Sequence, residues 1–146
     1  MNTAEDPIAA IDGITAVDDV GQLQVLEAAL DQLFQSPLPE RGVETLFRLF
    51  ERFPDDDGYG IFWTVLHGIE DQANYGPLLK ASLRRVPVTF NLLMVNRLLN
   101  SRLPNTQRQE WLALLGEVAN NPSCGKIAAE EARHYVEYWA ARSPGG

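Results

Sequence analysis

The sequence of 146 residues lacks several features that would define a class of protein. Its single cysteine, Cys124, excludes a disulfide framework and a cysteine-based zinc site, and indicates a reducing compartment. No apolar run approaches the roughly 18 residues of a membrane-spanning helix, and the first residues lack the basic stretch of a secretory signal. These absences predict a cytoplasmic protein with no membrane segment.

Motifs of catalysis and cofactor binding are also missing. There is no G-x-S-x-G turn for a nucleophilic serine, and no glycine pattern of the kinds that bind phosphate groups. Cys124 lies in the run NPSCG, which has no motif connecting it to a histidine. The sequence therefore predicts a protein that is not an enzyme and that needs no cofactor.

Positively charged residues are few, and they are unevenly distributed along the chain. Twelve Lys and Arg residues against twenty Asp and Glu give a net charge of −8, which disfavours nucleic acid as a partner. Residues 1–73 hold three basic and 15 acidic residues, a net of −12, whereas residues 74–146 hold nine and five, a net of +4. This asymmetry favours either a basic partner or self-association into a homo-oligomer, although acidic charge can also serve solubility alone.

The hydrophobic residues, 45% of the chain, recur with a helical period nearly everywhere. Their spacing predicts a short leader helix ending at Gly13 and seven long helices after it. Proline and capping signals place the starts of these helices near Asp18 or Asp19, Ser36-Pro37, Asp57, Pro77, Val88, Thr106 and Pro122. Thr106 and Gln109 have the spacing of a capping box.

Short connections between these helices predict antiparallel neighbours. Hairpin blocks at about 37–74, 75–101 and 104–141 favour a short α-solenoid-like stack, of the HEAT or armadillo kind, over a closed helix bundle. We expect one all-helical domain over residues 1–142 and a flexible tail at 143–146.

An acidic loop over residues 53–60, FPDDDGYG, precedes the predicted fourth helix. It does not have the spacing of a calcium loop, because alignment on Gly58 puts Phe53 and Thr64 where acidic ligands are needed. Asp57 is well placed to cap the helix. Asp55 and Asp56 are left over, which indicates a contact surface for a basic partner.

Trp63, His67 and Glu70 share one face of the helix that follows. An H-x-x-E pair occurs in di-iron helix bundles, but those need carboxylates from four helices and a second matched motif, which this sequence lacks. We therefore expect no metal here, and a structural hydrogen-bonded pair at or near the core.

The central third of the chain resembles a known family. The resemblance rests on the runs FPDDDGYGIFWTVLHGIE at 53–70, LLK at 78–80, Pro87, and NLLMVNRLLNS at 91–101. These are similar to the all-helical bacterial immunity proteins of polymorphic toxin and contact-dependent inhibition systems, in particular the group called immunity protein 30. Residues outside this region carry no such similarity.

The resemblance implies a non-catalytic cytoplasmic protein that binds and neutralises one cognate toxin. An acidic surface suits a basic toxin such as a nuclease, and the expected binding residues are Asp55, Asp56, Asp57 and Tyr59. Trp63, His67 and Glu70 are expected to hold the helix in place. The alternative is a helical-repeat adaptor that binds a protein or peptide, which a groove rich in exposed apolar and aromatic residues would favour.

Overall fold

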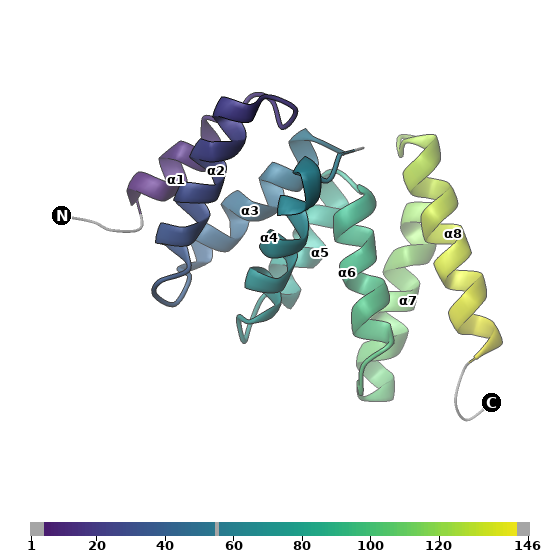
Figure 1. The fold of residues 1–146 in the computed structure, drawn as a ribbon. Helices are drawn as coiled ribbons and strands as arrows, with labels where there is room; N and C mark the ends of the chain where they lie inside the picture. Colours follow the sequence, from purple (N-terminus) through teal and green to yellow (C-terminus); the bar gives the residue numbers. More distant parts are fainter. Residues whose placement is uncertain (1–4, 55, 143–146) are drawn as a thin grey trace. The chain divides into compact units, whose positions relative to one another are not determined.

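The computed structural model describes residues 5–54 and 56–142, and within them the chain is all helical (Figure 1). This confirms the predicted fold class. The helices are α1 (Glu5–Asp12), α2 (Val20–Leu33), α3 (Glu40–Arg52), the 3-10 turn η1 (Gly58–Gly60), α4 (Ile61–Glu70), α5 (Gly76–Arg85), α6 (Thr89–Leu99), α7 (Asn105–Ala119) and α8 (Lys126–Ala141).

The chain divides into two compact units, residues 1–79 (unit 1) and residues 80–146 (unit 2), with the boundary inside α5. A single domain over residues 1–142 and the stacking of its hairpins as a solenoid or a bundle stay predictions. The predicted tail at 143–146 lies outside the described residues.

The division between the units is also the division of charge. Residues 74–79 contain no charged side chain, so unit 1 carries the whole net charge of −12 and unit 2 the whole net charge of +4. The charge asymmetry found in the sequence is therefore a difference in net charge between unit 1 and unit 2.

Unit 1 begins with α1, which packs against both α2 and α3. The side chain of Asp19 caps α2 by accepting a hydrogen bond from the Gln22 amide at 2.9 Å, as its position before the helix predicts. The predicted apolar stripes of the second and third helices are buried, and they consist of Leu23, Leu26, Leu30 and Leu33 in α2 and Val43, Leu46, Phe47 and Phe50 in α3.

α2 and α4 run in the same direction, since Glu27 and Leu30 of α2 line one cavity with Ile61 at the start of α4, and Phe34 meets Gly68 further along both helices. Phe34, at the end of α2, lies directly over Gly68 near the end of α4: a Cβ on Gly68 would be 2.3 Å from the Phe34 ring. Glycine at position 68 is therefore what allows these two helices to approach each other.

Two predicted helix starts, those of α3 and α8, and one predicted capping box, in α7, are wrong. α8 begins at Lys126 after its N-cap residue Gly125, instead of near Pro122. α3 begins at Glu40 instead of Ser36-Pro37, because Pro39 serves as its N-cap residue and disfavours a helical conformation at Leu38. α7 begins at Asn105 after Pro104, so Thr106 lies inside the helix and forms no capping box with Gln109. In α3 and α7 proline sets the boundary.

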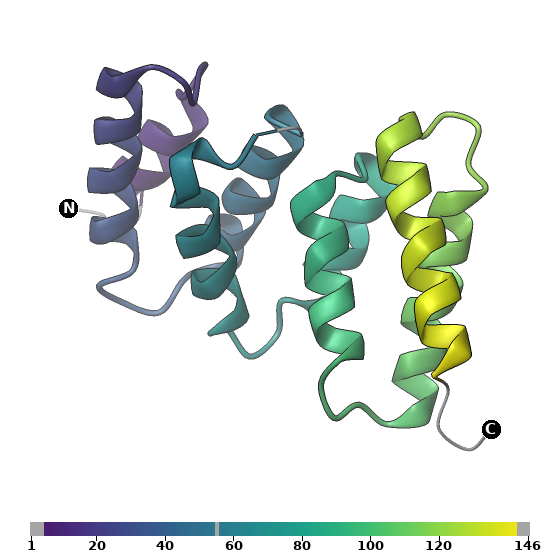
Figure 2. The ribbon, with the colours of Figure 1, turned by 45° about the vertical axis from the view of Figure 1, so that its right-hand side comes forward.

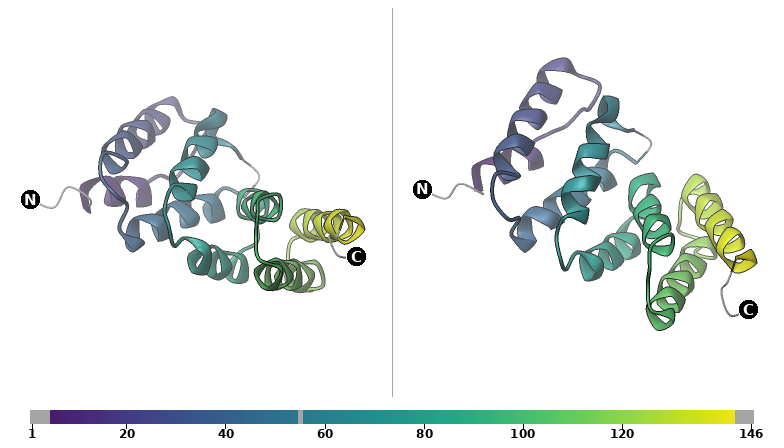
Figure 3. Two further views of the ribbon diagram at one scale, coloured as in Figure 1. Left: turned by 90° about the horizontal axis from the view of Figure 1, so that it is seen from below. Right: turned by 60° about the horizontal axis from the view of Figure 1, so that its bottom comes forward.

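In unit 2, α7 packs against α6 and α8 as two antiparallel hairpins, and α6 and α8 also contact each other (Figure 2). α6 and α8 run in the same direction, since Thr89 bonds Glu131 and, further along both helices, Trp139 bonds Asn96. Figure 3 (left) shows α6 end-on with α7 and α8 beside it.

The start of α6 depends on one buried amide. Asn91 is fully buried, its Oδ1 accepts from the Val88 amide at 2.8 Å, and its Nδ2 donates to Ser82 Oγ and the Val86 carbonyl, both at 2.9 Å. This one side chain therefore joins the end of α5 to the start of α6. None of the helices described is long and apolar enough to cross a membrane.

Candidate functional site

The acidic loop at residues 53–60 has an unusual backbone. Gly58, Tyr59 and Gly60 have φ angles of 57°, 52° and 92°, so three consecutive residues lie in the left-handed region. Two of them are glycines, which adopt this region without penalty, but Tyr59 pays a steric cost there. The Tyr59 side chain is 78% exposed, so no burial of its ring compensates that cost.

Asp56, not Asp57, provides the side-chain cap in this loop. Asp56 Oδ1 accepts a hydrogen bond from the Gly58 amide at 2.9 Å. Asp57 acts through its backbone, because its carbonyl accepts from the amides of Gly60 and Phe62, and its side chain makes no capping bond. The predicted capping role of the Asp57 carboxylate is thus wrong, and that carboxylate is exposed to solvent. Asp55 lies outside the described residues.

A cavity of about 300 Å³ lies beside this loop, between α2 and the start of α4. We call it the acidic cavity. It is lined by Glu27, Leu30, Asp31, Tyr59, Gly60, Ile61 and Thr64. Of these, only Tyr59 was predicted from the sequence. Glu27 and Asp31 are four residues apart on α2, hence on one face, and both are exposed.

The cations of unit 1 are all on α3: Arg41, Arg48 and Arg52. The Arg52 guanidinium donates to the Ile11 carbonyl at 2.9 Å and the Ile14 carbonyl at 3.4 Å. Burial lowers the pKa of Arg52, and the nearby carboxylate of Asp12 opposes that shift. Across the described residues, no cation forms an ion pair with Glu27 or Asp31.

Trp63, His67 and Glu70 do share one side of α4, but not in the position predicted for His67. His67 is exposed, so its expected burial at or near the core is wrong. Glu70 is half-buried, and Trp63, 41% exposed, lies with its ring centroid 6.3 Å from that of His67. The buried face of α4 is formed instead by Phe62, Val65, Leu66 and Ile69.

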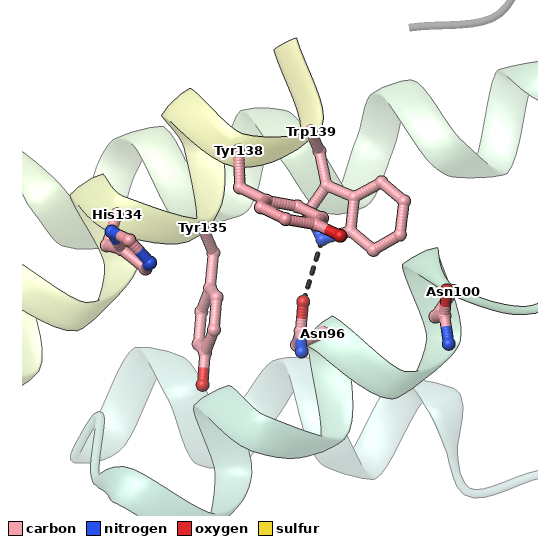
Figure 4. Close-up of a pocket in the computed structure, with 6 residues that line it drawn as sticks. All are labelled: Asn96, Asn100, His134, Tyr135, Tyr138 and Trp139. Carbon is pink, nitrogen blue, oxygen red and sulfur yellow. Dashed lines mark hydrogen bonds between the residues drawn. The ribbon is translucent and has the colours of Figure 1, made fainter. Parts of the chain in front are cut away.

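Unit 2 has a cavity of a different kind, which we call the aromatic pocket. It measures about 250 Å³ and is lined by Asn96, Asn100, His134, Tyr135, Tyr138 and Trp139 (Figure 4). The Trp139 indole N–H donates to Asn96 Oδ1 at 2.7 Å, and this bond connects α8 to α6. No carboxylate lines this pocket.

Two arginines lie against the aromatic rings of this pocket. The Arg142 guanidinium is 3.8 Å from the Tyr138 ring centroid, and that of Arg108 is 5.8 Å from the Trp139 ring centroid. Arg108 also donates to the Leu99 carbonyl at 2.8 Å and so helps to cap the end of α6. Tyr135 and Trp139 are four residues apart and so share one face of α8, but no pattern in the sequence pairs that face with α6.

Two side chains in unit 2, those of Tyr135 and Cys124, have raised pKa values. Burial, followed by the negative charge of Glu131, raises the pKa of Tyr135, and burial raises the pKa of the Cys124 thiol. The reactive thiolate form of Cys124 is therefore disfavoured. Within residues 5–54 and 56–142, no group of three or more His, Cys, Asp or Glu side chains is arranged to hold a metal ion.

Comparisons with known proteins add no assignment. No family model, no curated protein and no solved structure matches the chain.

Proposed function

We propose that this chain is a non-catalytic immunity protein that binds and neutralises a basic toxin domain in the cytoplasm, with unit 1 as the binding unit. The observation that carries the proposal is the concentration of a net charge of −12 in one compact unit, whose acidic loop displays Tyr59. A surface of this charge accelerates the encounter with a basic protein and makes binding sensitive to salt.

Tyr59 gives that surface an anchor. An aromatic side chain that is 78% exposed, next to the exposed carboxylate of Asp57, can enter a pocket of a partner with little loss of side-chain entropy. Its left-handed backbone supports the same interpretation, because costly conformations are retained more often at functional positions than elsewhere.

The direct test is to co-express the chain with the toxin domain encoded next to its gene, and to measure complex formation and rescue of growth. We expect both with the wild-type chain. In the triple variant Asp55→Asn, Asp56→Asn and Asp57→Asn, we expect the affinity to fall at least about tenfold. Asparagine keeps the side-chain oxygen by which residue 56 accepts from the Gly58 amide, so the loop retains its bonds.

The matched control replaces three exposed aspartates elsewhere in unit 1, Asp6, Asp18 and Asp71, with asparagine. It removes the same net charge and leaves the loop intact, so we expect a smaller loss of affinity and full rescue. Equal effects of the two triple variants would contradict a specific role of the loop. A gene with no toxin domain beside it, or a toxin that the chain neither binds nor neutralises, would contradict the proposed function.

The aromatic pocket favours a second candidate, a helical adaptor that holds a peptide or protein. Tyr135, Tyr138 and Trp139 line a cavity next to two parallel helices, and aromatic rings with amides are common in peptide-binding grooves. Replacing Tyr138 and Trp139 with alanine separates the two candidates: an adaptor that uses this pocket loses its partner, whereas an immunity protein that binds through unit 1 still rescues growth.

A further inference from the structure

The acidic cavity combines an apolar interior with an acidic rim. Leu30 is buried and Ile61 is half-buried, so the interior is aliphatic, whereas Glu27 and Asp31 are exposed. This is the environment that a long cationic side chain requires, since its methylene stem is apolar and only its end carries charge. The cavity thus has the polarity profile of a Lys or Arg side chain.

Its size and its lining favour arginine. The cavity of about 300 Å³ is at the small end of ligand pockets, which range from about 300 to 1,000 Å³, so it suits one side chain better than a cofactor. A planar guanidinium can stack on an aromatic ring such as that of Tyr59 and bond carboxylates through several N–H groups. The ammonium of lysine lacks that planar geometry.

Within residues 5–54 and 56–142, no cationic side chain pairs with the two carboxylates of the acidic cavity. The three arginines of unit 1 are on α3, and no side chain of the described residues forms an ion pair with Glu27 or Asp31. Two carboxylates one turn apart on a helix repel each other, and the binding of one cation between them relieves that repulsion.

We propose that the acidic cavity is the receptor for an arginine side chain of a basic protein partner, which Glu27, Asp31 and Tyr59 hold between α2 and α4. This inference rests on the proposed function and specifies which chemical group of the partner the cavity binds. It also moves part of the binding surface from the aspartate loop to α2, where no sequence motif indicated one.

The test uses Nα-acetyl-arginine amide as a probe and follows the backbone amide signals of the full chain by NMR. We expect the probe to shift the signals of residues 27–31 and 59–64. Nα-acetyl-citrulline amide, the uncharged isostere, is expected to shift them at least about tenfold less at equal concentration, and the lysine analogue is expected to bind more weakly than arginine.

The variant Glu27→Gln with Asp31→Asn is expected to lose at least about tenfold in affinity for the probe. Asp18→Asn with Asp71→Asn, which removes the same charge from exposed positions elsewhere in unit 1, is the matched control and should bind within about twofold of wild type. All four positions are exposed, so both variants should keep the thermal stability of the wild type, which circular dichroism checks. Equal loss in the two variants, or equal binding of citrulline, would overturn the arginine receptor.

The toxin domain separates this inference from the proposed function. If the toxin binds Glu27→Gln/Asp31→Asn as tightly as wild type, the cavity is not the partner's contact and the inference fails while the proposed function stands. If the toxin binds no variant and not the wild type, but the arginine probe occupies the cavity, the cation site stands and the proposed function fails.

Discussion

Unit 1 and unit 2 each have a cavity beside two helices that run in the same direction, α2 with α4 and α6 with α8. The chemistry of the two linings is opposite. Glu27 and Asp31 make the first cavity acidic, whereas the second has aromatic rings and amides, with arginines stacked on the rings and no carboxylate. Similar helix arrangements can therefore present different partners with different surfaces, and the lining residues, more than the arrangement, determine what binds.

The two units also differ in how their helices are connected. In unit 2 a buried amide, Asn91, accepts from the Val88 amide at the start of α6 and donates to Ser82 of α5 and to the Val86 carbonyl just after α5. In unit 1 a partly exposed guanidinium, that of Arg52, holds the connection between α1 and α2 through two carbonyls. A buried polar group without a partner costs much more than an exposed one, so these two connections should differ in energy.

The substitution with the largest expected effect tests this difference in energy between the two connections. Asn91→Ala leaves the buried Val88 amide without its acceptor and removes both bonds made by the side-chain N–H₂ group, so the free energy of unfolding should fall by about 2–4 kcal/mol. Arg52→Met should lower the free energy of unfolding by about 1 kcal/mol, because the Ile11 and Ile14 carbonyls can then accept hydrogen bonds from water. Urea denaturation measures both, and equal losses would contradict the distinction.

A second comparison concerns one glycine inside a helix in each unit. In α4 of unit 1, a Cβ at Gly68 would meet the Phe34 ring, whereas in α7 of unit 2 a Cβ at Gly116 would meet nothing within 4 Å. We expect Gly68→Ala to lower the free energy of unfolding by about 1–3 kcal/mol through overpacking. Gly116→Ala should raise it by about 0.5–1 kcal/mol, because alanine is the better helix former.

Denaturation curves of the two alanine variants check the sign of each change. The sharpest outcome is the opposite sign, since the two substitutions are chemically identical. No loss of stability in Gly68→Ala would contradict a limiting contact between Phe34 and Gly68, and a loss of stability in Gly116→Ala would contradict the open space at that glycine.

The smallest effect concerns alkaline pH and unit 2. Because the pKa of Tyr135 is raised, the unfolded chain loses the phenolic proton at a lower pH than the folded chain does. Its contribution to stability is thus complete below pH 10, about the ordinary pKa of tyrosine, and is lost as the pH rises through the folded pKa. Tyr135→Phe should flatten the fall of stability above about pH 10.

Glu131→Gln should have an intermediate profile, because it removes the charge that contributes to the raised pKa and keeps the oxygen that accepts from Thr89. Thermal unfolding followed from pH 8 to about 11 measures all three chains. Identical profiles of wild type and Tyr135→Phe would contradict the role of Tyr135.

Much of the fold follows from local signals in the sequence. The cap at Asp19 and the buried leucines of α2 could be predicted because each depends on residues within a few turns of the same helix. The start of α3 and the capping box of α7 were mispredicted because a proline sets each boundary, and the start of α8 was mispredicted because Gly125, not Pro122, precedes it. His67 was misplaced because Phe62, Val65, Leu66 and Ile69 determine which face of α4 is buried.

The candidate sites were less predictable than the helices. Tyr59 and Asp57 could be found because they lie in one loop, but Glu27 and Asp31 are separated from it by a whole helix and meet it only through packing. Asn96 and Trp139, which join across the aromatic pocket, are likewise far apart in sequence. Contacts between distant segments leave no periodic trace in a single sequence.

The left-handed backbone at Gly58, Tyr59 and Gly60 has a consequence for how recognition can diverge. Two glycines, the Asp56 side chain and the Asp57 carbonyl maintain the loop, so its shape depends little on which side chain residue 59 carries. At residue 59, asparagine, aspartate or histidine tolerate the φ angle, whereas valine or isoleucine would strain it. Under the proposed function, partner choice can therefore change by single substitutions at this position, within a short list of residues, without a new fold.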